Sequence, residues 1–258
     1  MVTGSPPRGG LFCARPAPTH PALVTPSDTL VYAGPSFESA ISIDNVIFGF
    51  EAGKVRVLLV RRGIRPFLNT WALPGDFVAP AEALDAAAER VLRDLTGLSN
   101  LYLEQVHSIA TPGRHPEGRV ITVAYYSLIG TSDHPVSPRG WAESARYFDL
   151  DDLPELAFDH RDILEVCLRR LRERVRRRPI GFELLPTEFT LSDLQALYEA
   201  LLAEELDKRN FRKKILQTGL VRPTGNLQEG VSHRPAKLYR FDVDEYERLR
   251  RRGFNWEI

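Results

Sequence analysis

A short segment between residues 75 and 98 carries side chains that could bind a metal ion. Glu82 precedes a stretch of helical periodicity, and Asp94 lies within that stretch. Carboxylates three or four residues apart share one helix face, where they can hold Mg²⁺ against a diphosphate. Here two positions of that face are the apolar Val91 and Leu95. Because a multi-metal clamp needs several carboxylates on one face, Glu82 and Asp94 alone are too few to form one.

The same segment resembles the Nudix box, G-x5-E-x7-R-E-U-x-E-E-x-G-U, where U is a bulky aliphatic residue. The residues that keep the spacing are Glu82, Arg90, Leu92, Gly97 and Leu98, and the preceding WALPG resembles the strand that leads into the box. The motif glycine falls on Asp76, and the helix glutamates fall on Val91, Asp94 and Leu95. A segment that keeps the spacing of the motif but lacks most of its metal-binding glutamates predicts a domain that binds a nucleotide rather than cleaving it. An ordinary charged surface helix and a residually active hydrolase are the alternatives.

A second functional cluster lies near the C-terminus, where residues 206–240 hold nine Lys/Arg and two Asp/Glu. Phe211 and Ile215 are four apart and would face inward on a helix, which leaves cations and amides on the opposite face. Such a face can neutralise phosphates, and its Asn and Gln can read base edges. A solvated helix face is the ordinary alternative. The predicted DNA contacts are Lys208, Arg209, Asn210, Arg212, Lys213, Lys214 and Gln217 on the helix, with Arg234 and Lys237 after it.

The elements that must position these groups fall into two modules. In the first, apolar runs over 40–50 and 54–62 predict a hairpin, and further strands are expected over 101–111 and 119–129, with a last one beginning near Tyr147. Helical periodicity covers 83–95 and ends at Gly97, whereas 160–178 is a helix with basic last turns.

Pro179 ends that helix and opens the second module. Thr190 is expected to cap a helix with one apolar face, and Asp207 to cap a second helix over 208–217. A strand-like stretch over 237–241 follows them. Two helices joined by a turn and followed by a β-ribbon predict a winged helix-turn-helix domain.

The charge distribution supports this division. The chain is neutral overall, but residues 1–159 hold 13 Lys/Arg against 18 Asp/Glu, and residues 160–258 hold 21 against 16. Such asymmetry suggests an acidic module joined to one that meets an anion. Two cysteines without a C-x-x-C pair favour a reducing cytoplasm. Without an apolar run of about 18 residues, no membrane contact is expected.

Residues 38–250 as a whole resemble the Nudix-related transcriptional regulators of bacterial NAD metabolism. Four segments carry the resemblance, 71–78, 182–195, 206–216 and 234–241. It implies a homodimeric repressor that binds palindromic double-stranded operator DNA, takes ADP-ribose or a related NAD-derived nucleotide as its effector, and needs no cofactor. Because other members of this group control sugar catabolism, the regulon stays open. The alternatives are a nucleoside-diphosphate hydrolase with a nucleic-acid-binding appendage and an RNA- or protein-binding adaptor.

We therefore predict an α/β fold, a Nudix-like α/β/α sandwich with a mixed sheet followed by a C-terminal winged helix-turn-helix domain. The expected divisions are a disordered tail (1–37), an effector-binding domain (38–155), a linker helix (156–180) and the winged helix (181–258). Arg61 and Arg62 could face a diphosphate or equally lie in a solvated hairpin loop, whereas for Arg114 and His115 a plain surface turn is the preferred interpretation and a ligand contact the alternative. The predicted effector-binding residues are Arg61, Arg62, Trp71, Asp76, Phe77, Glu82 and Arg114. No metal site is expected, because the histidines lack metal-ligand spacing.

Overall fold

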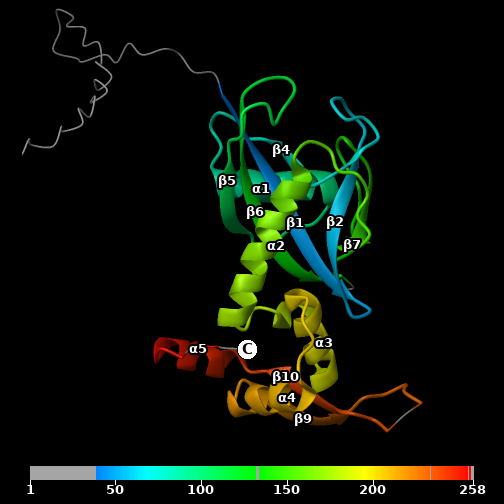
Figure 1. Ribbon diagram of the computed structural model, residues 1–258, viewed down its shortest axis with the longest axis vertical. Helices are drawn as coiled ribbons and strands as arrows, with labels where there is room; N and C mark the ends of the chain where they lie inside the picture. Colours follow the sequence, from blue (N-terminus) through cyan, green and yellow to red (C-terminus); the bar gives the residue numbers. More distant parts are fainter. Residues whose placement is uncertain (1–38, 132–133, 233, 255, 257–258) are drawn as a thin grey trace, which may run out of the picture. The chain divides into compact units, whose positions relative to one another are not determined.

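The computed structural model of the protein describes residues 39–131, 134–232, 234–254 and 256. The predicted tail, residues 1–37, lies outside the described residues. The first module contains β1 (Ala40–Glu51), β2 (Lys54–Arg62), β3 (Trp71–Ala72), β4 (Gly75–Phe77), α1 (Leu84–Thr96), β5 (Glu104–Ile109), β6 (Val120–Gly130) and β7 (Ala142–Asp149). Helix α2 (His160–Arg177) then leads to the C-terminal elements, coloured yellow to red in Figure 1.

The strands of the first module form one mixed sheet. Its main path runs β3-β2-β1-β6-β5, while β4 pairs with β1 and β7 pairs with β2. β1 runs parallel to β6 along its length, from Ala40 opposite Val120 to Phe50 opposite Gly130. The pairing of β1 with β2 is antiparallel and forms the predicted hairpin. Because β1 is central, its side chains, which alternate between the two faces, lie near the middle of each face of the sheet.

Alternation along β1 divides the core between those two faces. Val46 and Phe48 are buried in a cluster with residues of α2, whereas Ile43 and Ile47 are buried in clusters with residues of α1. Successive side chains of a strand point to opposite faces, so one helix packs on each side of the sheet. This arrangement confirms the predicted α/β/α sandwich with a mixed sheet.

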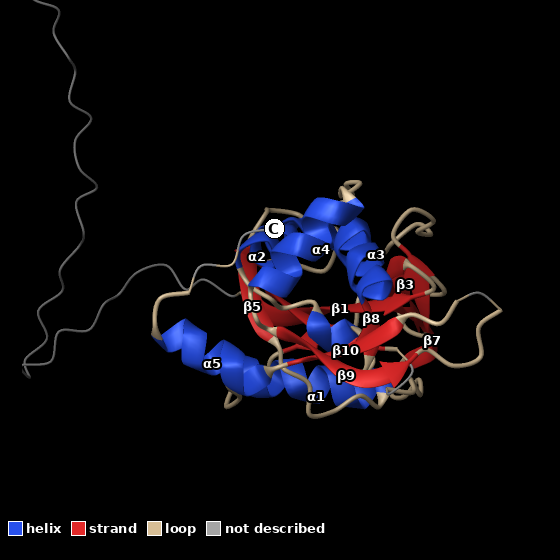
Figure 2. Cartoon of the chain, turned by 90° about the horizontal axis from the view of Figure 1, so that it is seen from below, coloured by secondary structure: helices blue, strands red, loops and turns tan. Residues whose placement is uncertain are grey.

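The C-terminal elements form the predicted winged helix. After a 3₁₀ turn, η1 (Phe182–Leu184), come β8 (Phe189–Thr190), α3 (Leu191–Leu202), α4 (Lys208–Gln217), β9 (Val221–Leu227) and β10 (Lys237–Phe241). The Thr190 hydroxyl accepts a hydrogen bond from the Asp193 amide, and the Asp207 carboxylate accepts one from the Asn210 amide, so both predicted caps are present. β10 lies between β8 and β9 in a small antiparallel sheet, visible beside α3 and α4 in Figure 2.

Two elements differ from the sequence-based expectation. β7 begins at Ala142 rather than near Tyr147. Its pairing with β2 continues through polar residues before Tyr147 as far as Ala142, which lies opposite Arg62 after an irregularity between Arg61 and Arg62. A last helix, α5 (Val243–Arg251), was not predicted. It is capped by the Asp242 carboxylate, which accepts from the Glu245 amide, and its apolar Tyr246 and Leu249 are only partly buried against the core. No helix in the described residues is long and apolar enough to cross a membrane.

Candidate functional site

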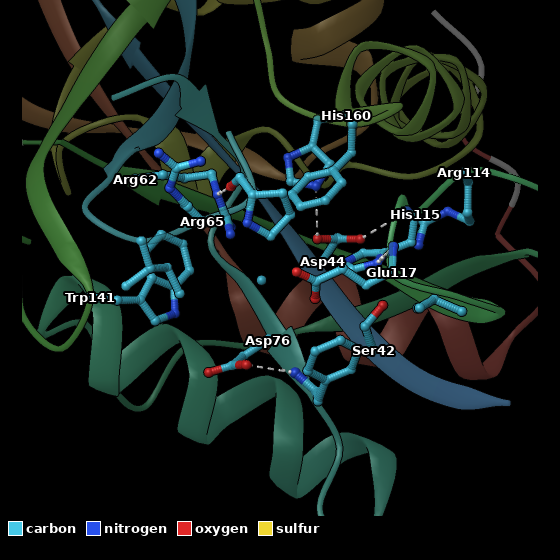
Figure 3. A pocket seen from close by; sticks show the side chains of 16 residues that line it. Ser42, Asp44, Arg62, Arg65, Asp76, Arg114, His115, Glu117, Trp141 and His160 are labelled. Atoms are coloured by element: carbon cyan, nitrogen blue, oxygen red, sulfur yellow. Dashed lines mark hydrogen bonds and ion pairs between the residues drawn. The ribbon is translucent and has the colours of Figure 1, made fainter. Parts of the chain in front are cut away.

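A cavity of about 110 Å³ opens beside the N-terminal half of β1. β4, the loop after β2, the loop between β5 and β6 and the start of α2 complete its walls, and Figure 3 shows their side chains converging on it. The cavity combines charged groups with aromatic rings. Its lining residues are Ser42, Asp44, Arg62, Ile64, Arg65, Pro66, Gly75, Asp76, Phe77, Arg114, His115, Glu117, Val120, Trp141, Phe158 and His160.

The floor of the cavity is the carboxylate of Asp44, which is only 4% exposed. It accepts a 2.6 Å hydrogen bond from the Thr122 hydroxyl and lies 3.3 Å from His160 Nε2. The Leu73 amide donates to His160 Nδ1 at 2.9 Å, so Nδ1 carries no proton and Nε2 is the nitrogen that donates to Asp44. Burial lowers the pKa of His160, because the charged ring would lose hydration. The pair therefore combines a buried carboxylate with a neutral histidine.

Arg114 lies beside this pair and joins it to α2. Its side chain is only 5% exposed and makes two hydrogen bonds to the Asp159 carboxylate, at 2.8 Å from Nε and 2.6 Å from Nη2. Its Nη2 also lies 3.6 Å from the Asp44 carboxylate. The loop carrying Arg114 is mostly exposed, as a surface turn would be, but the Arg114 side chain itself is held against two acidic residues.

Arg62 is the second buried cation of the cavity. Its guanidinium carbon lies over two rings, 4.8 Å from the centre of the Trp141 ring and 4.9 Å from that of Phe158. Its Nε donates to the Pro66 carbonyl at 2.8 Å. Burial lowers the pKa of Arg62, whereas the nearby carboxylates, Asp76 first, oppose that effect. Stacking on two aromatic faces orients the guanidinium fork, which suits binding of a phosphate.

Aromatic rings continue along the wall from Phe158. The His115 ring stacks on Phe158, with centroids 5.1 Å apart and an interplanar angle of 17°, and lies 5.8 Å from Phe77. Burial lowers the pKa of His115, which favours the neutral ring. Phe77 itself is 46% exposed at the rim. An exposed ring beside stacked rings offers a flat apolar surface on which a planar base can stack.

Gly75 and Asp76 define the approach of β4 to β1. A Cβ on Gly75 would lie 2.1 Å from Oδ1 of Asp44 and 2.8 Å from the Ile43 carbonyl, so any other residue would displace the backbone. Glycine at this position therefore allows β4 to lie against the Asp44 carboxylate. At the next position, the Asp76 carboxylate accepts from the Phe77 amide at 2.8 Å and faces the cavity.

The side chains of α1 at the motif's metal-binding positions do not suit a Mg²⁺ ion. Val91 and Leu95 are 0% and 2% exposed, in one buried cluster with Val60 and Ala142. The retained Glu82 is bound to the guanidinium of Arg90. Among the residues described, no group of three or more His, Cys, Asp or Glu side chains could hold a metal ion. The positions of the missing ligands have become part of the hydrophobic core.

Four of the predicted effector-binding residues, Arg62, Asp76, Phe77 and Arg114, line the cavity. The other three lie outside it. Arg61 is exposed on β2 and donates to the Asn69 carbonyl, Trp71 packs against Phe148 with centroids 4.8 Å apart, and Glu82 is bound to Arg90.

Several lining residues were not predicted from the sequence, among them Asp44, His160, Trp141 and Phe158. Asp44 had a signal, because it interrupts an otherwise apolar strand that must be buried. The others come from loops or from the start of α2, where no local pattern indicates that they meet.

The candidate nucleic-acid surface is the exposed face of α4. Phe211 and Ile215 are 4% and 0% exposed, and the Phe211 ring lies 5.7 Å from that of Tyr198 on α3. Arg212 is partly buried and donates to the Ser192 hydroxyl at 2.9 Å, which ties it to α3. The remaining predicted side chains of the helix are exposed, namely Lys208, Arg209, Asn210, Lys213, Lys214 and Gln217.

The ribbon after α4 adds further cations. Arg234 and Lys237 are exposed, as is Arg240, which was not predicted as a contact. Arg222 on β9 lies 2.6 Å from the carboxylate of Asp242, which neutralises its charge. Among the described residues of the ribbon, the exposed cations that form no ion pair lie on β10 and the segment just before it.

Comparisons with known proteins agree with both halves of this description. Residues 40–167 match the Nudix domain family, and residues 181–241 match the NrtR DNA-binding winged helix domain family. The chain is 35% identical to the ADPR responsive transcriptional repressor NtrR of Acinetobacter baylyi, over 80% of this chain and 84% of that relative. It is 32% identical to an ADP-ribose pyrophosphatase of Methanocaldococcus jannaschii, over 50% of this chain and 73% of that enzyme.

A solved structure is similar over both modules. Shewanella oneidensis NrtR, crystallised with a 27mer DNA, has a TM-score of 0.69 and 28% identity, over 84% of this chain and 97% of the solved chain. The similarity thus extends across the Nudix domain and the winged helix together. This chain belongs to the NrtR family and combines a Nudix domain with the DNA-binding winged helix domain of that family.

Proposed function

We propose that this protein is a transcriptional repressor whose Nudix domain binds ADP-ribose, or a related NAD-derived nucleotide, without cleaving it. The observation that carries the proposal is the composition of one cavity. Two buried arginines, Arg62 and Arg114, and several aromatic rings line that cavity, while Val91 and Leu95 stand at two of the metal-binding positions of the Nudix motif. The A. baylyi relative, which is ADPR responsive, supports the same effector.

The cavity offers complementary chemistry for each part of such a ligand. Arginine forks bind phosphate oxygens in pairs, and Arg62 is already oriented by Trp141 and Phe158. Phe77 and His115 offer ring faces for a base. The carboxylates of Asp76 and Glu117 can accept hydrogen bonds from sugar hydroxyls. The effector-binding residues that we propose are therefore Arg62, Asp76, Phe77, Arg114, His115 and Glu117.

The DNA-binding surface in this proposal is α4 with the ribbon that follows it. Arg209 and Lys213 are four residues apart and exposed, so both can enter a major groove while Phe211 and Ile215 face the core. Arg234, Lys237 and Arg240 would contact phosphates. Since one recognition helix covers only a half-site, we infer a homodimer on a palindromic operator. The effector domain would span residues 38–155, the linker helix 156–180 and the winged helix 181–258, with the protein in the cytoplasm beside its DNA.

A hydrolase is the second candidate, because the chain is also similar to an ADP-ribose pyrophosphatase. The buried Val91 and Leu95 and the occupied Glu82 argue against it. NAD biosynthesis or salvage genes are the regulon that we propose, and sugar catabolism is the alternative.

DNA binding is tested with the purified full-length chain on DNA from upstream of its own gene. We expect protection of two half-sites related by a two-fold axis, with centres about one helical turn apart or a multiple of it. Arg209→Ala should need a higher protein concentration for the same protection, whereas Arg61→Ala, which alters an exposed residue away from α4, should protect the DNA as the unmodified chain does. Equal affinity for the upstream DNA and for a scrambled duplex of the same length would contradict a specific repressor.

A further inference from the structure

The Asp159 carboxylate lies between two kinds of hydrogen-bond donor, the guanidinium of Arg114 and the backbone amides at the start of α2. Asp159 immediately precedes α2, where aspartate commonly accepts a hydrogen bond from an amide of the first turn. Within the described part of the chain, its side chain makes no such capping bond. It instead accepts both hydrogen bonds from Arg114, at 2.8 and 2.6 Å. The Asp159 carboxylate is therefore held by Arg114, while the Asp159 carbonyl accepts from the amides of Asp162 and Ile163 at 3.0 and 3.2 Å.

An anion in the cavity would contact Arg114 directly and would affect Asp159 only through Arg114. Arg114 lines the cavity, whereas Asp159 is not among its lining residues. The Arg114 side chain is 5% exposed and that of Asp159 is 17% exposed, so water screens this ion pair poorly. Asp159 takes two of the five guanidinium N–H donors of Arg114, and an anionic group that binds the same edge of the guanidinium would compete with Asp159 for those two.

We propose that Arg114 and Asp159 form an anion-sensitive latch between the cavity and α2. A diphosphate group that binds Arg114 releases the Asp159 carboxylate, which then turns toward the start of α2 and accepts from the Arg161 amide, since the Asp162 amide already donates to the Asp159 carbonyl. Asp159 thus exchanges one favourable interaction for another, and a small free-energy difference between the two arrangements suffices to switch it. The inference rests on the proposed function in one respect only, that the cavity is where the effector binds.

Helix α2 is suited to carry this change toward the DNA-binding elements. Its first residue, His160, contacts the buried Asp44, and its last turns contact the winged helix. There, the Arg172 guanidinium donates to the Leu201 carbonyl of α3 at 3.1 Å, and Arg176 lies 2.6 Å from Glu204 just beyond α3. One continuous helix therefore has the latch at its beginning and the winged helix at its end.

Amide hydrogen exchange of the full-length protein tests the latch with inorganic pyrophosphate, a diphosphate that is not a nucleotide. In the unmodified chain, saturating pyrophosphate should slow exchange at residues 160–163 about fivefold, the size expected of one helix cap. Asp159→Ala should remove this protection, because the variant has no carboxylate to release. The matched control is Asp162→Asn, which changes an exposed carboxylate on the same turn and should keep the protection. Unchanged exchange in the unmodified chain, or equal protection in Asp159→Ala, would overturn the latch.

A second arm separates the latch from the identity of the effector. In Asp159→Asn the ion pair with Arg114 is weakened, so pyrophosphate and ADP-ribose should both bind roughly fivefold more tightly or better than to the unmodified chain. Protection by pyrophosphate without any binding of ADP-ribose would support the latch and contradict the proposed effector. Wild-type affinity of Asp159→Asn for pyrophosphate, with an unchanged melting temperature, would count against the latch itself.

Discussion

The carboxylate of Glu82 accepts two hydrogen bonds from the guanidinium of Arg90, at 2.7 Å from Nε and 2.9 Å from Nη2. These bonds, with a further one from the Ala79 amide, lower the pKa of Glu82 to about 2. The one motif glutamate that this chain keeps is thus ionised and already bound within the protein. It helps to hold the loop before α1, and its position does not make a metal site.

We therefore expect no useful hydrolysis of ADP-ribose. Val91 and Leu95 cannot bind a cation, and Glu82 is engaged by Arg90. AMP release should be followed with excess ADP-ribose in the presence of Mg²⁺ and, separately, Mn²⁺. Metal-dependent turnover near the ordinary enzyme range of about 1 s⁻¹ or faster would show that the chain is a hydrolase.

Restoring a motif glutamate should damage the fold rather than create an enzyme. Leu95 is 2% exposed, so Leu95→Glu would bury a carboxylate without a partner and should lower the free energy of unfolding by about 3–5 kcal/mol. The control is Asp94→Glu on the neighbouring exposed position, which should change it by no more than about 0.5 kcal/mol. Denaturant unfolding measures both. A fully stable Leu95→Glu protein would mean that this helix face is open to water.

The buried His160 predicts a loss of stability in mild acid. Its pKa is lowered in the folded state, chiefly by burial, so the unfolded state binds the proton more readily. The contribution of neutral His160 is complete above its unfolded pKa of about 6.5 and is lost as the pH falls below that value. Melting temperatures between pH 8 and pH 5 should therefore decline in the unmodified chain.

His160→Gln, which cannot take up a proton, should flatten this decline whatever its effect on stability at pH 8. Glu82 also loses its ion pair on acidification, but its pKa of about 2 places that loss at lower pH. A decline of the same size in His160→Gln would assign the acid sensitivity to other groups.

Operator recognition should depend on the exposed side of α4 and folding on its buried side. If Arg209 donates hydrogen bonds to a guanine edge, Arg209→Ala should weaken the free energy of operator binding by about 1–3 kcal/mol and relax specificity at one base pair. Lys237→Ala should weaken all duplexes nearly equally and reduce the salt slope by about one. Phe211→Ala, at a position 4% exposed, should instead lower the free energy of unfolding by about 3–5 kcal/mol.

Affinities for operator and scrambled duplexes at several salt concentrations, with thermal melts, separate these effects. Normal operator binding by folded Arg209→Ala and Lys213→Ala proteins would show that another surface recognises the DNA.

Local sequence patterns predicted the elements because they have local causes. Thr190 and Asp207 cap their helices through side-chain oxygens, and Phe211 and Ile215 lie four apart on one face of α4. The cavity was predicted only in part. Arg62 and Arg114 were recognised as cations near turns, but their partners come from distant parts of the chain.

Asp159, for example, lies 45 residues from Arg114, and no spacing rule links the two. Trp141 and Phe158 likewise meet Arg62 only because β7 and the approach to α2 fold against the end of β2. Sequence reasoning failed for α5 for a different reason. This helix has nine residues, a cap and i,i+3 ion pairs such as that of Arg248 with Glu245, and its few apolar residues are only partly buried, so its hydrophobic pattern is short.

The measurement that tests the central claim most directly is the affinity of the full-length protein for its operator across a titration of ADP-ribose. A repressor with an effector-binding Nudix domain should change its operator affinity by roughly 5–150-fold at saturation, a coupling of about 1–3 kcal/mol. By linkage, operator DNA should change the affinity for ADP-ribose by the same factor. Operator affinity that stays constant while ADP-ribose binds the cavity would contradict the account.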